Sequence, residues 1–109
     1  MDLNKNEKKE LLPLIEAPNV PIKGKEERTC SEARIIVDIS LEIDHDNTGV
    51  NVKIFKPDDS KPEEFPVAFH NPLYKEYDNP KLGLFKLEID SDKANIVSIK
   101  GSNWIKPPA

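Results

Sequence analysis

His70 is the residue of this chain whose neighbours best suit general-base catalysis. It follows the apolar run Phe65–Phe69 and precedes a stretch that contains Glu76 and Asp78. A histidine beside a carboxylate can accept a proton in a reaction. One histidine near one acid is also the pattern of a hydrogen-bonded loop anchor. We favour the anchor, so a small enzyme centred on His70 is only the second alternative for the function.

Asp44 and Asp46 begin a pattern that resembles part of a calcium-binding loop, because oxygen ligands at alternate positions precede Gly49. The pattern then fails. Phe55 occupies the position where such a loop requires a bidentate glutamate, and the flanking segments alternate like strands. A turn in which aspartate side chains bond their own backbone explains the same residues. We therefore expect no bound metal and no cofactor.

Cys30 is the only cysteine, so the chain cannot form an intramolecular disulfide. No local motif supplies a base that would activate its thiol as a nucleophile. Met1–Glu10 is charged and lacks the apolar segment of a secretory signal. No apolar run approaches the roughly 20 residues that span a bilayer. These features predict a soluble protein of the reducing cytoplasm that does not enter membranes.

The chain has 109 residues, which fits one domain, and its formal net charge is −4. Basic residues are scattered along it, and Lys8-Lys9 is the longest basic run. Nucleic-acid binding needs clustered lysine and arginine to neutralise phosphates. This acidic composition therefore argues against a nucleic-acid partner.

Two strand–loop–strand patterns dominate the rest of the sequence. Apolar residues alternate with polar ones in Arg34–Ile43 and Val50–Phe55, and again in Leu82–Asp90 and Ile96–Lys100. A short acidic loop separates the two segments of each pattern, so we predict two antiparallel hairpins. For Ile96–Lys100 the alternation leaves open which of its two faces is buried.

The remaining segments complete a mainly-β prediction. Phe65–His70 suits a short edge strand because Pro66 cannot donate a ladder hydrogen bond. Lys56–Pro66 and Asn71–Lys81 suit irregular loops. We predict an all-β fold, either a small antiparallel sandwich or a partly open barrel of about five strands.

The N-terminal region differs in composition from these strands. Asp2–Leu12 favours a short helix, and the following prolines favour an extended arm. Lys23–Glu32 is charged and nearly free of apolar residues, which is typical of a linker. We therefore assign residues 1–32 to an arm and linker that is partly flexible, and residues 33–109 to the β domain with an irregular C-terminal tail.

The missing catalytic motifs favour a non-enzymatic accessory module that binds another protein. The N-terminal arm, an edge strand and the 71–81 loop are the candidate binding segments, and an edge strand also permits a homodimer. We expect a variant lacking Met1–Arg28 to stay folded and to lose its partner.

A small-ligand or carbohydrate-binding β domain is the first alternative. For Trp104 we favour a structural role over binding, as a core residue that closes one end of the fold. The candidate partner-binding residues are Leu11, Leu12, Leu14, Ile15, Tyr74, Tyr77 and Trp104.

Overall fold

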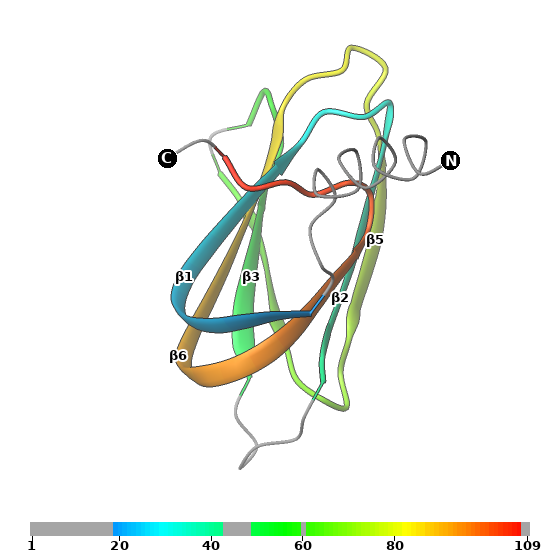
Figure 1. Cartoon of the computed structure of the whole chain (residues 1–109). Coiled ribbons are helices and arrows are strands. Elements are labelled where there is room, and N and C mark those ends of the chain that lie inside the picture. Colours follow the sequence, from blue (N-terminus) through cyan, green and yellow to red (C-terminus); the bar gives the residue numbers. More distant parts are fainter. Residues whose placement is uncertain (1–18, 43–48, 60, 108–109) are drawn as a thin grey trace, which may run out of the picture.

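The computed structural model describes residues 19–42, 49–59 and 61–107, which form one antiparallel sheet that curls into an open half-barrel (Figure 1). The predicted all-β class is confirmed for these residues, with six strands rather than about five. The helix expected at Asp2–Leu12 lies outside the described residues. The strands are β1 (Asn19–Cys30), β2 (Arg34–Leu41), β3 (Val50–Phe55), β4 (Glu63–Val67), β5 (Leu73–Asp78) and β6 (Phe85–Gly101).

The long strand β6 organises the sheet. β1 pairs along one edge of its 17 residues, from Cys30 opposite Phe85 to Asn19 opposite Ser98. On the other edge, β3 pairs with the first half of β6 and β2 pairs with the second half. β4 and β5 then extend the sheet beyond β3 and β2. The two halves of β6 therefore carry two arms of the sheet, and the bend of β6 brings these arms face to face (Figure 1).

The hairpin predicted for Leu82–Asp90 and Ile96–Lys100 is wrong, because one continuous strand, β6, runs through both segments from Phe85 to Gly101. Ser91 lies opposite Gly24 and Asn95 lies opposite Ile22, so three residues of β6 oppose Lys23 alone. Such a bulge bends a strand without ending it. The buried Asn95 amide holds the bulge by donating to Ser91 Oγ at 2.8 Å and to the Lys93 carbonyl at 3.2 Å. After the bulge, Val97 is buried and Ile96 is exposed. The face of Ile96–Lys100 that carries Val97 is therefore the inward one.

The hairpin predicted for Arg34–Ile43 and Val50–Phe55 is also wrong. Both strands exist, as β2 and β3, but they pair with different halves of β6 and not with each other. Their alternate aliphatic residues, including Ile35 and Val52, are fully buried. A hairpin would place both apolar faces side by side in one layer. The curled sheet instead lets the two faces pack against each other, which buries both.

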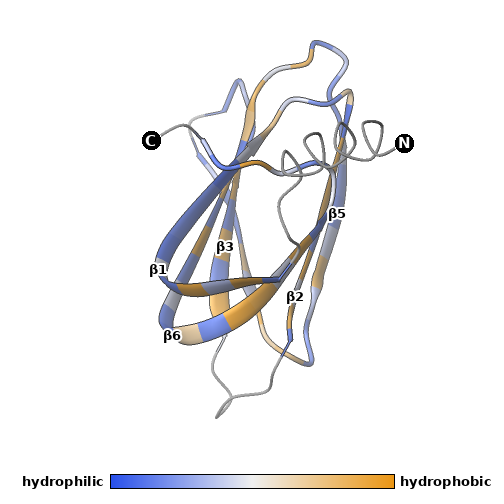
Figure 2. Cartoon of the chain, in the orientation of Figure 1, coloured by the Kyte–Doolittle hydropathy of each residue, from blue (hydrophilic) through white to orange (hydrophobic). Residues whose placement is uncertain are grey.

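Residues 19–30 form β1, so the assignment of this segment to an arm and linker is wrong. The side chains of Lys25 and Glu27 lie on the outer face with Lys86 and Glu88, where Lys25–Glu88 and Lys86–Glu27 ion pairs form. This strand is mostly hydrophilic along its length (Figure 2), and pairing with β6 orders it. A deletion of Met1–Arg28 would remove most of β1 and cannot leave the sheet intact.

The core lies between the two arms. Its inward-facing residues come from every strand, and the C-terminal tail adds Trp104. The tail leaves the sheet after Gly101, as predicted, and Ile105 exchanges two backbone hydrogen bonds with Thr29 of β1. The fully buried aliphatic residues are Ile35, Val37, Ile39, Val52, Ile54, Val67, Leu87, Ile89 and Val97.

The two outermost strands were predicted only in part. The expected edge strand at Phe65–His70 exists as β4, which begins two residues earlier and ends three residues earlier, and Ala68–Asn71 forms a turn. The expected loop Asn71–Lys81 contains β5, so that loop prediction is wrong for residues 73–78. β4 and β5 end the path β4-β3-β6-β2-β5. Each of them therefore has one edge without a strand partner among the described residues.

Candidate functional site

The free edge of β5 can be assigned from the contacts of its neighbour β2. The Ile36 carbonyl accepts hydrogen bonds from Ser102 N and Trp104 Nε1, both at 2.9 Å, and Ile36 N donates to Ser102 Oγ at 2.6 Å. Ile36 therefore points its backbone groups away from β5. In an antiparallel ladder these directions alternate along a strand. Glu76, the partner of Ile36, then points its own N–H and C=O outward, as do Tyr74 and Asp78.

β5 differs from the two other strands that have an unpaired edge. β4 carries Pro66, which lacks an N–H, and Pro66 lies opposite Asn51 in the ladder. β1 carries Pro21 and the left-handed Gly24, and its Thr29 already bonds the C-terminal tail. Prolines, bulges and covering segments are the usual devices that protect an edge from pairing. β5 contains no proline, and its outward backbone groups have no partner among the described residues, although it carries charged side chains such as the inward-facing Lys75, which lies over the Phe65 ring of β4.

An ion-pair network covers the outer face of β2 and β5. Arg34 donates to Glu76 and, at 3.2 Å, to Asp78, and Tyr74 OH donates to Glu76 at 2.8 Å. The hydrogen bond from Arg34 lowers the pKa of Glu76, and the hydrogen bond to Glu76 raises the pKa of Tyr74. Tyr74 is 56% exposed. This face presents an aromatic ring and two carboxylates beside the free edge.

Side chains bridge β4 and β5 on their inner face. Tyr77 OH donates to Glu63 Oε1 at 2.6 Å, and Lys56 Nζ lies 3.0 Å from Glu63 Oε2. The Tyr77 ring packs against Phe85 with the centroids 5.5 Å apart. Burial raises the pKa of Tyr77, and the hydrogen bond from Tyr77 lowers the pKa of Glu63. These contacts hold the two edges at a fixed separation without backbone pairing.

We expect Tyr77→Phe to lower the free energy of unfolding by about 1–2 kcal/mol near neutral pH, because the variant loses a hydrogen bond to a charged acceptor. The lowered pKa of Glu63 adds stability above its ordinary pKa of 4.5, which is lost as the pH falls below that value. The raised pKa of Tyr77 adds stability below its ordinary pKa of 10.0, which is lost at higher pH. Urea unfolding of both proteins across this pH range measures the difference.

Tyr74→Phe is the matched control, since Tyr74 also donates to a glutamate from β5 but does so in solvent. We expect its free energy of unfolding to stay within about 0.5 kcal/mol of the parent protein. Equal losses for the two variants would contradict the structural role assigned to the Tyr77–Glu63 contact.

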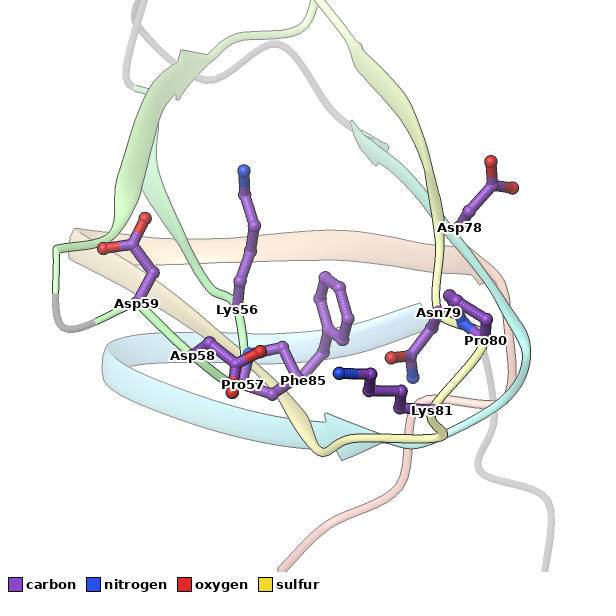
Figure 3. Close-up of a pocket in the computed structure, with 9 residues that line it drawn as sticks. All are labelled: Lys56, Pro57, Asp58, Asp59, Asp78, Asn79, Pro80, Lys81 and Phe85. Carbon is purple, nitrogen blue, oxygen red and sulfur yellow. The ribbon is translucent and has the colours of Figure 1, made fainter.

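A pocket of about 430 Å³ opens where β5 ends (Figure 3). Residues of the β3–β4 and β5–β6 connections form its rim, and Phe85 lies at its base. The Lys81 side chain extends across it toward Pro57 and Phe85 (Figure 3). The residues that line it are Lys56, Pro57, Asp58, Asp59, Asp78, Asn79, Pro80, Lys81 and Phe85.

Asn79 holds one wall of this pocket. Its buried amide donates to the Glu32 carbonyl at 3.0 Å and to the Gly83 carbonyl at 2.8 Å, and it accepts from Gly83 N at 3.1 Å. Leu82 adopts a φ of 55°, which is rare for a leucine. Pro57 packs so closely on Gly83 that a Cβ there would lie 2.6 Å from it. These contacts therefore hold the β5–β6 connection in one conformation.

The candidate residues chosen from the sequence do not form one surface. Tyr74 lies on the outer face of β5 and Tyr77 on its inner face, as their alternate ladder positions require. Trp104 is buried in the core, as the structural role favoured for it predicted. The apolar cluster of the arm lies outside the described residues, namely Leu11, Leu12, Leu14 and Ile15.

The candidate chemical residues are equally separate. His70 is exposed in the turn between β4 and β5, edge-on to the Phe69 ring, and it does not line the pocket at the end of β5. Cys30 is buried, and this burial raises the pKa of its thiol. Asp44 and Asp46 lie outside the described residues. Within residues 19–42, 49–59 and 61–107, no group of three or more acidic, histidine or cysteine side chains is arranged to hold a metal.

Sequence reasoning missed Arg34, Glu63 and Asn79. Arg34 and Glu76 are 42 residues apart and meet only through the β2–β5 register. Asn79-Pro80 is a turn signal that sequence rules do associate with loops. That signal could have predicted the turn. It could not have predicted that the Asn79 amide bonds the Glu32 carbonyl, 47 residues away.

Comparisons with protein-family models, with curated proteins and with solved structures find no match to this chain. In the part of the chain that the structure describes, no helix has the length and apolar character needed to cross a membrane.

Proposed function

We propose that this protein is a non-enzymatic interaction module that binds an extended segment of another protein as an added strand on β5. The open edge of β5 is the observation that carries the proposal. The outward N–H and C=O groups of Tyr74, Glu76 and Asp78 can each bond a partner backbone. Strand addition of this kind obtains its affinity from backbone hydrogen bonds. It unites two of the expected binding segments, the edge strand and residues 71–81.

The charges of β5 favour a different protein over a second copy. If two copies paired antiparallel at the centre of β5 with their outward backbone groups bonded, either Glu76 would lie opposite Glu76 of the other copy or Lys75 would lie opposite Lys75. Like charges directly opposite each other destabilise a strand pair. A homodimer through this edge is therefore disfavoured near neutral pH. The buried, single Cys30 suits a reducing compartment, so we place the module in the cytoplasm.

The test uses peptides selected from a random 12-residue display library with the full-length protein. We expect the selected peptides to bind Glu76→Pro at least about tenfold more weakly, because proline removes the outward N–H and its ring obstructs the edge. The β2–β5 ladder survives, since Glu76 does not bond β2 through its backbone. Titration calorimetry with synthetic copies of the peptides measures the affinity.

Glu76→Gln is the matched control, because it keeps the N–H and the side-chain size and should retain binding. Peptides methylated at alternate backbone nitrogens provide a test that leaves the protein unchanged, and one of the two methylation registers should abolish binding. Failure to select any peptide, or peptides indifferent to both Glu76→Pro and methylation, would overturn the proposal.

A further inference from the structure

We propose that the pocket at the end of β5 receives a lysine or arginine side chain of the added strand. This inference rests on the proposed function and names the residue that the partner must carry. The pocket is lined by Asp78 and Asn79, which directly continue the free edge (Figure 3). A strand laid along β5 points alternate side chains to the inner face, where Tyr77 also points. A side chain opposite Tyr77, or two residues further along, lies at the pocket mouth.

The walls of the pocket suit a long side chain with an apolar stem. Pro57, Pro80 and Phe85 supply apolar surface on different sides of it. Lysine and arginine bury such stems while their charged ends stay near water or a carboxylate. Lys81 already places a stem of this kind across the pocket (Figure 3). The chain's own lysine shows that an aliphatic stem of this kind can lie against Pro57 and Phe85.

The charges at the rim select a cation. Three aspartates and two lysines line the pocket. Asp78 is already paired with Arg34 at 3.2 Å, so Asp58 and Asp59 of the β3–β4 connection are the acids left to meet an incoming cation. Lys56 is engaged by Glu63 at 3.0 Å and lies over the Tyr77 ring, so its charge is already compensated. Lys81 is exposed and can swing into solvent when another cation enters. An acidic side chain would instead meet two aspartates of the β3–β4 connection.

The test uses the peptides selected with the display library described above. We expect these peptides to share a lysine or arginine at one fixed position. We expect replacement of that residue by norleucine, which keeps the stem without the charge, to weaken binding roughly three- to tenfold. The double variant Asp58→Asn/Asp59→Asn should weaken binding of the basic peptide by a similar factor and leave the norleucine peptide unaffected. Lys81→Ala should strengthen binding of the basic peptide about two- to fivefold, because it removes a competing cation.

Asp92→Asn, an exposed acid away from this pocket, is the control variant and should change neither affinity. The outcomes separate the two proposals. Peptides that depend on the β5 edge but carry no basic residue, or whose basic residue is indifferent to Asp58→Asn/Asp59→Asn, would overturn this inference and leave the strand-addition proposal standing. Peptides indifferent to Glu76→Pro and to backbone methylation would overturn both.

Discussion

Arg28→Ala is expected to lower the free energy of unfolding by about 2–4 kcal/mol, because it removes a buried arginine that bonds the partly buried Glu26 and packs beneath β1. Arg28 is 2% exposed and lies on the inner face of β1, opposite Leu87. Its guanidinium bonds Glu26 and donates to the Glu27 carbonyl at 2.9 Å. The substitution leaves Glu26 without its main counter-charge and creates a void beneath β1. Urea unfolding followed by circular dichroism measures the loss.

Arg34→Ala is the matched control. Arg34 also bonds two acidic residues, Glu76 and Asp78, but its side chain is 60% exposed. Exposed ion pairs contribute little, so we expect a loss of less than about 1 kcal/mol. The contrast attributes the effect to burial rather than to the number of contacts. A loss for Arg28→Ala no larger than that for Arg34→Ala would contradict the buried placement of Arg28.

The double variant Glu26→Leu/Arg28→Met adds a second check. Replacing both members of a buried ion pair by apolar residues is often neutral or stabilising. We therefore expect the double variant to recover most of the stability lost in Arg28→Ala. Recovery would show that the pair is maintained for a reason other than stability, whereas an equal loss would show that the shape of the arginine is required.

Trp104→Ala is expected to cost a similar amount, about 3–5 kcal/mol, through the loss of a large buried side chain. Trp104 is 5% exposed, and its Nε1 donates to the Ile36 carbonyl at 2.9 Å. The adjacent Ile105 bonds Thr29 of β1. The indole therefore anchors the tail to β2, next to the point where Ile105 bonds β1. Its removal should weaken the contacts of the tail with both strands. Far-ultraviolet circular dichroism in urea measures the stability of the variant.

Two further variants separate the parts of this effect. Trp104→Phe keeps most of the apolar contact but loses the hydrogen bond, so we expect an intermediate cost of about 1–2 kcal/mol. Ile105→Ala changes an exposed side chain and keeps the backbone bonds, so its effect should stay within about 0.5 kcal/mol. A cost below about 1 kcal/mol for Trp104→Ala would contradict the core position of the indole.

Binding provides a separate measurement on Trp104. It is the only tryptophan, so native fluorescence reports on this residue alone. Because it lies in the core and lines neither the β5 edge nor the pocket at its end, peptides added along β5 should leave its emission nearly unchanged. Trp104 is therefore not expected to contact a partner on β5, whereas Tyr74 is exposed beside the free edge.

The sequence by itself determined where β2, β3 and the first half of β6 lie and which of their faces is buried. Alternation of aliphatic and polar residues in β2, β3 and β6 is a local property, because successive side chains of any strand point to opposite sides. Burial follows the same alternation in the structure, as the fully buried Ile35, Val37 and Ile39 show. The predicted edge position of Pro66 rests on an equally local fact, the missing N–H.

Only the tertiary structure decided which strands pair. An acidic segment such as Asp90–Asn95 suits a hairpin turn and a bulge equally well, and the difference lies in the partner. β1 pairs with β6 on both sides of the bulge, through Gly24 and Ile22, so β6 continues as one strand across it. β1 itself shows little alternation, because the buried Arg28 and the partly buried Glu26 occupy inward positions as an ion pair. No local pattern distinguishes those charges from the charges of a linker.

The candidate site follows from the same long-range choices. The direction of the free backbone groups of β5 is read from the bonds of Ile36 to the tail, 66 and 68 residues away in the sequence. The pocket depends on two connections, near Pro57 and Asn79, that meet only when the sheet curls. Local sequence specified the strands because each side chain's environment alternates along its own strand. The site required the fold because its parts come from strands that only the curl of β6 brings together.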